Sequence, residues 1–157
     1  MPHVAIETVI MAPLLVLQII LLPMVAVTIT SYWSDQSRDV AVQEVANQLA
    51  GVIQQLYSSL NMKEVSNGTV RWASTLPKEV VSHPYTANGW LQTWSGSNSS
   101  RILTLQIELQ DVGNTATAIV TLGLNVLWNQ TSVFHSDYSN AAIEVQKSDG
   151  ILSFSFK

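Results

Sequence analysis

The stretch from Val9 to Ile29, VIMAPLLVLQIILLPMVAVTI, constrains this 157-residue chain more than any other feature. Its only polar side chains are Gln18 and Thr28, and no charged residue occurs between Glu7 and Asp35. A helix over this run would be roughly 32 Å long, close to the roughly 30 Å hydrocarbon thickness of a bilayer. The remaining chain is too small to cover such a rod. We therefore expect it to lie in lipid or to be wrapped by identical rods of neighbouring subunits.

Composition narrows the classes of function. Charged residues make up 11 % of the chain, against the roughly 25 % that is usual in soluble domains. The seven Lys and Arg residues are scattered and the net charge is −4, so no basic patch is available to neutralise nucleic-acid phosphates. The absence of cysteine excludes disulfides, thiolate metal sites and a cysteine nucleophile.

The residues ahead of the run, MPHVAIET, contain no Lys or Arg and no evident cleavage site, unlike a secretory signal peptide. The positive-inside rule, applied to the chain as printed, would place the Arg38 side in the cytosol. Two interpretations stay open. Either the membrane topology is weakly determined, or a basic leader ahead of Met1 has been removed, and we favour the second.

Two prolines, Pro13 and Pro23, lie inside the apolar run. Each deletes one backbone hydrogen bond, which neighbouring groups can compensate inside a membrane or a bundle. They predict either slight kinks in a transmembrane helix or a helix built to bend as it moves from bilayer to assembly.

From Ser34 the chain becomes amphipathic but keeps the helical period. The apolar positions of this part are Val42, Val45, Leu49, Val52, Leu56 and Leu60. Because neither Gly nor Pro separates the two parts, we expect one helix from about Val4 to Leu60, roughly 85 Å long. Gly51 is its weak point or a place of close helix approach. Asn61 and the Ser66-Asn67-Gly68 cluster end it.

After this point the pattern favours strands. The expected strands are 69–73, 90–94, 101–110, 116–128, 142–147 and 151–156. Hairpin turns are expected at 111–114 and 148–150, and loops are marked by Pro77, Pro84, Gly89 and Gly96. The sequence therefore predicts an α+β fold, with a long helix over residues 1–61 (apolar 9–29, amphipathic 34–60). A small antiparallel β-rich head follows over residues 62–157, and one of its faces packs on the amphipathic half of the helix.

Residue patterns for catalysis are sparse. None of His3, His83 and His135 has a second His at a metal-binding spacing, and no phosphate loop, nucleophile elbow or paired carboxylates occur. We predict no enzymatic activity, no metal and no cofactor. The five tryptophans could form a sugar-binding platform, although core packing is the more common use in a small β-domain.

Three tripeptides, at Asn67, Asn98 and Asn129, fit the N-glycosylation rule, and chance in a Ser/Thr/Asn-rich surface is the alternative. Tyr32 and Trp33 follow the apolar run directly, as an aromatic belt at a membrane interface or as contacts between subunits. Both interpretations place them at the boundary of the apolar zone.

Glu7 stands at the mouth of the apolar run, where an unpaired carboxylate would be costly. It either lies at headgroup level in water or forms an ion pair with the positive N-terminus of a neighbouring subunit. The ion pair would set the axial register of a helical stack.

The order of these parts resembles a type IV pilin: Glu7 at the mouth of the run, a long helix, then a β-rich head. The segment from Ala5 to Pro23 is also similar to the N-terminus of tight-adherence pilins. The cysteine-free head with its sequons resembles archaeal type IV pilins and archaellins. The resemblance implies processing by a prepilin peptidase, insertion in the cytoplasmic membrane, and polymerisation by assembly machinery into a filament with the helices at its core. The expected subunit-packing residues are Glu7, Val9, Pro13, Leu14, Leu17, Ile20, Leu21, Pro23, Val27, Tyr32 and Trp33.

We therefore expect a structural subunit of an extracellular filament on the cell surface, for adhesion or attachment; motility by the same plan stays open. The alternative is a single-pass membrane protein with an extracellular sensing or sugar-binding head. A membrane-tethered hydrolase has no supporting motif.

Overall fold

The computed structural model describes residues 3–93 and 100–157, and for residues 3–10 and Ala12 it describes the backbone alone. The chain divides into two compact units, Met1–Ser37 and Arg38–Lys157. The second unit combines the second half of the long helix with the described strands, an α+β arrangement as the sequence predicts.

The helix α1 runs from His3 to Leu60 and contains both prolines, so the prediction of one continuous helix is confirmed. It ends where Asn61 donates its backbone N–H to the Tyr57 carbonyl at 2.9 Å. Beyond this point the chain turns toward the first strand, as the turn-forming residues after Asn61 predict.

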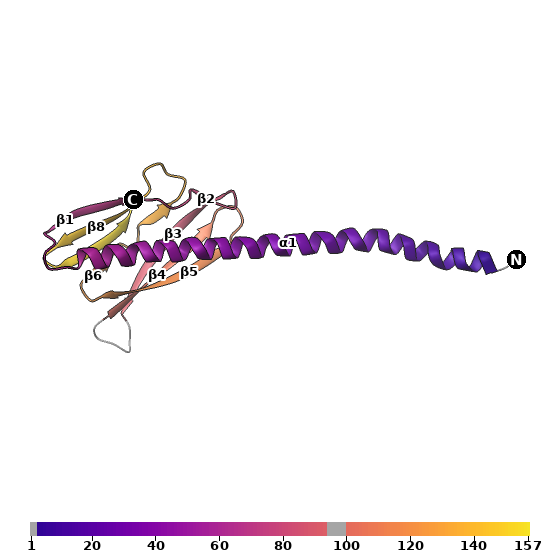
Figure 1. Cartoon of the computed structure of the whole chain (residues 1–157), viewed down its shortest axis with the longest axis horizontal. Helices are drawn as coiled ribbons and strands as arrows, with labels where there is room; N and C mark the ends of the chain where they lie inside the picture. Colours follow the sequence, from indigo (N-terminus) through magenta and orange to yellow (C-terminus); the bar gives the residue numbers. More distant parts are fainter. Residues whose placement is uncertain (1–2, 94–99) are drawn as a thin grey trace. The chain divides into compact units, whose positions relative to one another are not determined.

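The strands form two sheets (Figure 1). Their bounds are β1 Gly68–Ala73, β2 Glu79–Val80, β3 His83–Thr93, β4 Ser100–Leu109, β5 Thr115–Gly123, β6 Val126–Trp128, β7 Val133–His135, β8 Ala142–Ser148 and β9 Ile151–Phe156. One sheet has the order β1-β8-β9-β6, and the other has the order β2-β3-β4-β5 with β7 also paired to β3. The pairs are antiparallel except β6–β9, which is parallel.

The predicted single strand 116–128 is wrong near its C-terminal end, because it breaks into β5 and β6 at Leu124 and Asn125. The break follows from contacts with distant parts of the chain. Gly123 approaches the Tyr57 hydroxyl so closely that a Cβ would lie 2.5 Å from it. Asn125 donates its side-chain amide to Asn61 Oδ1 at 2.7 Å and to the Gly150 carbonyl at 2.8 Å. These contacts direct the chain from one sheet to the other.

The loop assignment of Pro84 and Gly89 is also wrong, since both lie inside β3. Pro84 is the second residue of the strand, where its carbonyl accepts from Gln110 N. Gly89 has a packing role, because a Cβ there would lie 2.6 Å from the Trp128 ring of the other sheet. Pro77 does lie in a loop, and Gly96 falls outside the described residues.

Both predicted hairpin turns are confirmed. Asp111 and Gly113 join β4 to β5 with φ of 71° and 72°, and Asp149 and Gly150 join β8 to β9 with φ of 51° and 81°. These left-handed conformations explain why Asp and Gly occupy the turns.

One core joins the amphipathic part of α1 to both sheets. The helix contributes Val42, Val45, Ala46, Leu49, Ile53 and Leu60 as buried residues. The strands add alternate residues; in β5, for example, Ala116, Ala118, Val120 and Leu122 are buried. The predicted Val52 and Leu56 lie at the margin of this core.

The tryptophans Trp128 and Trp33 differ in their burial. Trp128 is buried between Phe154 and Phe156, at ring-centroid distances of 6.3 and 5.0 Å, which confirms the core interpretation for this residue. Trp33 is exposed on the helix and belongs to another surface.

Candidate assembly surface

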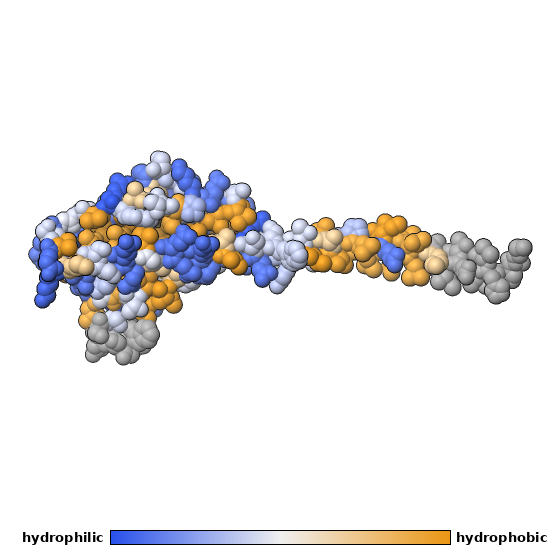
Figure 2. Space-filling model, in the orientation of Figure 1, coloured by the Kyte–Doolittle hydropathy of each residue, from blue (hydrophilic) through white to orange (hydrophobic). Residues whose placement is uncertain are grey.

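The first half of α1 presents an uncovered apolar surface. Every described side chain from Met11 to Trp33 is exposed, and the large aliphatic ones among residues 14–29 are between 46 % and 70 % exposed. Figure 2 shows this part of the helix predominantly in the hydrophobic colour. Exposed apolar patches on soluble monomers rarely exceed a few hundred Å², and larger ones are typical of surfaces that contact lipid or other proteins.

The structure places the predicted packing residues Pro13, Leu14, Leu17, Ile20, Leu21, Pro23 and Val27 on this surface. At about 100° per residue they cover one side of the helix. Leu15, Ile19 and Leu22 lie on the opposite side and are equally exposed. The all-round apolar pattern of the run is the sequence signal for these three residues.

The polar groups near the end of the run are satisfied within the helix. Thr28 and Thr30 donate their hydroxyls to the carbonyls four residues earlier, each at 2.9 Å, and Ser31 donates to the Thr28 carbonyl at 3.0 Å. Such bonds let a hydroxyl enter an apolar environment without leaving an unpaired donor. The segment is therefore suited to lipid or to a helix bundle.

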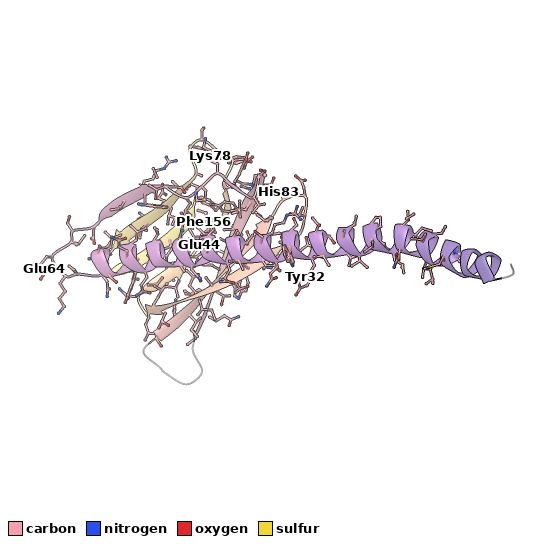
Figure 3. All side chains as sticks on the ribbon, turned by 45° about the vertical axis from the view of Figure 1, so that its right-hand side comes forward. Tyr32, Glu44, Glu64, Lys78, His83 and Phe156 are labelled. Atoms are coloured by element: carbon pink, nitrogen blue, oxygen red, sulfur yellow. The ribbon has the colours of Figure 1, made fainter. Side chains whose placement is uncertain are left out.

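Tyr32 and Trp33 close this surface, at 66 % and 69 % exposed. Figure 3 shows Tyr32 pointing away from the helix axis. Positions 7 and 9 belong to α1, but the side chains of Glu7 and Val9 lie outside the described residues, so the Glu7 ion pair stays a prediction.

Within the described residues, no group of three or more His, Asp or Glu side chains is arranged to hold a metal ion. His135 stacks on Tyr138 with ring centroids 4.6 Å apart, and His83 begins β3.

Shallow hollows lie on the described part of the second unit. One, of about 360 Å³, lies on the outer face of β6, β8 and β9 and is lined by Leu127, Trp128, Asn129, Glu144, Gln146, Ser153, Phe154, Ser155 and Lys157. Another, of about 500 Å³, lies at the C-terminal end of α1 and includes Asn61, Asn67 and Lys147. Lys147 is only 8 % exposed and donates its ammonium to the Leu60 and Met62 carbonyls at 2.8 and 2.7 Å. Its charge is used to cap the helix.

The sequon asparagines have different surroundings. Asn67 makes two hydrogen bonds with Asp149, and Asn129 accepts two from Thr131. Asn98 lies outside the described residues.

Comparison with models of protein families, with curated proteins and with solved structures found no match to this chain. The helix is long and apolar enough to cross a membrane, by length and composition. The chain thus has a long apolar N-terminal helix followed by a β-rich domain, a layout compatible with a pilin-like subunit.

Proposed function

We propose that this chain is the structural subunit of an extracellular type IV pilus-like filament that polymerises through the first half of α1 and serves surface adhesion or attachment. The observation that carries the proposal is the exposure of the described apolar side chains from Met11 to Trp33 on all sides of one helix. A surface of this kind can be covered on every side by lipid or by neighbouring helices.

The free energy of covering the apolar part of α1 favours two successive environments for it, first lipid and then a bundle of neighbouring helices. Covering about 15 large apolar side chains at roughly 1.5–3 kcal/mol each stabilises the covered state by tens of kcal/mol relative to water. The same helix gains little when it moves from lipid to a bundle, because lipid is already apolar. In this proposal, assembly from the cytoplasmic membrane requires machinery that supplies energy.

The competing function is a single-pass membrane protein with an extracellular binding domain. The length and composition of the apolar run support this alternative equally well. The filament proposal gains support from the second half of α1, because the helix continues without interruption until it contributes its own residues to the core of the β-domain. A membrane anchor alone does not require such continuity.

The deciding experiment is electron microscopy of material sheared from producing cells, with the subunit identified by mass spectrometry. We expect filaments from the wild-type chain and none from Ile20→Asp, since a carboxylate there could not be covered by apolar neighbours. Ser139→Asp adds the same charge at an exposed position of the β-domain and should leave filaments intact. Wild-type protein found only as membrane-bound monomers would reject the proposal and favour the anchored binding domain.

A further inference from the structure

The two sequons that the structure describes differ in whether the side-chain amide nitrogen of the asparagine is free. We propose that Asn129 carries a covalently attached glycan that covers the hollow on the outer face of β6, β8 and β9. The side chain of Asn67 instead stays unmodified and holds the segment after α1 to the β8–β9 turn. The inference rests on the proposed function only in requiring that the β-domain is exported from the cell.

Asn129 is held so that its amide nitrogen is presented to solvent. Its Oδ1 accepts from the Thr131 backbone N–H at 3.1 Å and from the Thr131 hydroxyl at 2.8 Å. Its backbone N–H donates to the Phe154 carbonyl at 2.9 Å, and its carbonyl accepts from the Ser132 hydroxyl at 2.7 Å. Asn129 is exposed, and its Nδ2 has no hydrogen-bond partner among the described residues. The nitrogen that would bear a glycan is therefore free.

Asn67 uses both polar atoms of its side chain. Its Nδ2 donates to Asp149 Oδ1 at 3.4 Å, and its Oδ1 accepts from the Asp149 backbone N–H at 3.1 Å. Asp149 is one of the left-handed residues of the β8–β9 turn, so these bonds join the segment after α1 to that turn. Thr69, the hydroxyl residue of this sequon, lies in β1 opposite Gln146, and no bond joins its hydroxyl to Asn67 within the described residues.

The hollow beside Asn129 has the chemistry to receive sugars. Its polar lining consists of Glu144 and Gln146 of β8, Ser153 and Ser155 of β9, and Lys157. The strand registers place Gln146 opposite Ser153 and Glu144 opposite Ser155, so hydroxyl, amide and carboxylate groups lie side by side. Leu127, also in the lining, is exposed and offers an apolar contact for a sugar ring face. A volume of about 360 Å³ accommodates the first sugars of a chain.

The modification is a glycosyl transfer from a lipid-linked sugar phosphate, catalysed by a glycosyltransferase of the producing cell. Asn129 Nδ2 attacks the anomeric carbon, and a nitrogen–carbon bond forms as the carbon–oxygen bond to the phosphate breaks. The departing phosphate keeps the electron pair of that bond and takes up the amide proton. The hydroxyl of Thr131 holds the amide through Oδ1, so Ser can replace Thr and Ala cannot.

The test is intact-mass analysis and glycopeptide mapping of the full chain purified from producing cells. We expect the peptide containing Asn129 to carry a glycan mass that is lost in Asn129→Gln and Thr131→Ala and kept in Thr131→Ser. The same mass should remain in Asn67→Ala, in which the midpoint of thermal unfolding falls by several degrees. An unmodified Asn129 peptide in the wild type, or a glycan on Asn67, would overturn the assignment.

The position of the glycan is tested by hydroxyl-radical footprinting of Leu127. We expect labelling of Leu127 to rise at least twofold in Asn129→Gln and in Thr131→Ala relative to the wild type. Equal labelling in all three proteins would refute contact with the hollow. Electron microscopy of the same material separates this inference from the proposed function: filaments without a glycan at Asn129 reject the inference alone, and a glycosylated protein without filaments rejects the filament alone.

Discussion

Lys147 shows how a single residue can join the helix to the sheet. Its stem lies among the buried residues of β8, and its ammonium reaches two carbonyls at the end of α1, where the helix dipole is negative. We predict that Lys147→Met, which keeps the stem and removes the charge, lowers the free energy of unfolding by about 1.5–3 kcal/mol. Denaturant unfolding of the full chain in detergent measures the change. Lys63→Met, at an exposed position, should stay within about 0.5 kcal/mol of the wild type, and an equal loss in both variants would contradict the capping role.

Tyr85 makes the free energy of unfolding of the β-domain sensitive to alkaline pH. Burial raises the pKa of its hydroxyl from 10.0 to about 12, and the hydroxyl donates to the Pro77 carbonyl at 2.9 Å. Below pH 10 both the folded and the unfolded chain keep this proton, so its contribution to stability is fully present. As the pH rises from 10 to 12 the unfolded chain releases the proton first, and the free energy of unfolding falls by about 2–3 kcal/mol.

The matching variant is Tyr85→Phe, studied by denaturant unfolding across this pH range. We expect it to be less stable than the wild type at pH 7 by about 1 kcal/mol, because the bond to Pro77 is lost. Between pH 10 and 12 its stability should decline less steeply than that of the wild type. Parallel curves for the two proteins would show that Tyr85 is not the titrating group.

Substitution of Gly51 in α1 and of Gly89 in β3 by alanine should change the stability of the chain in opposite directions. Nothing lies within 4 Å of a Cβ built at Gly51, whereas a Cβ at Gly89 would meet the Trp128 ring at 2.6 Å. Gly51→Ala should therefore stabilise the monomer by about 1 kcal/mol, and Gly89→Ala should destabilise it by about 1–3 kcal/mol. Thermal unfolding in detergent checks both. A loss of filaments in the more stable Gly51→Ala variant would identify this glycine as a place of close helix approach.

The elements that follow a regular local pattern could be predicted from sequence. The spacing of the apolar residues indicates α1, and the turn-forming residues after Leu60 indicate its end. The turns at 111–114 and 148–150 contain residues that tolerate positive φ. The break between β5 and β6 could not be predicted, since its causes are contacts of Gly123 and Asn125 with Tyr57 and Asn61. The beginning of β3 was missed because Pro84 and Gly89 are usually signs of loops.

The candidate site shows the same division. The apolar run predicts an apolar helix surface, and the structure exposes Leu15, Ile19 and Leu22 as well as the predicted packing residues on the other side of the helix. The difference between Asn67 and Asn129 could not be predicted from the sequence, because both asparagines lie in tripeptides that fit the same glycosylation rule. It depends on Asp149 and on the bonds of Thr131, which only the folded chain brings into place.

At the scale of the whole molecule, the two compact units should differ in their solubility in water. The fully buried core residues of α1 begin at Val42, and the exposed apolar surface ends at Trp33. We predict that a chain beginning at Asp35 is soluble and monomeric without detergent and unfolds in one cooperative transition. Size-exclusion chromatography and calorimetry provide the measurement. Aggregation of the shortened chain would show that the β-domain itself has a further association surface.

The place of β9 has a consequence for the order of events during synthesis. This strand lies between β8 and β6, yet the chain supplies it after every other described element. The four-stranded sheet therefore cannot close until residues 151–156 have emerged from the ribosome. By then the apolar segment has long been available for membrane insertion, since synthesis proceeds from the N-terminus. In the proposed filament subunit, membrane insertion of the first half of α1 would thus precede closure of the four-stranded sheet.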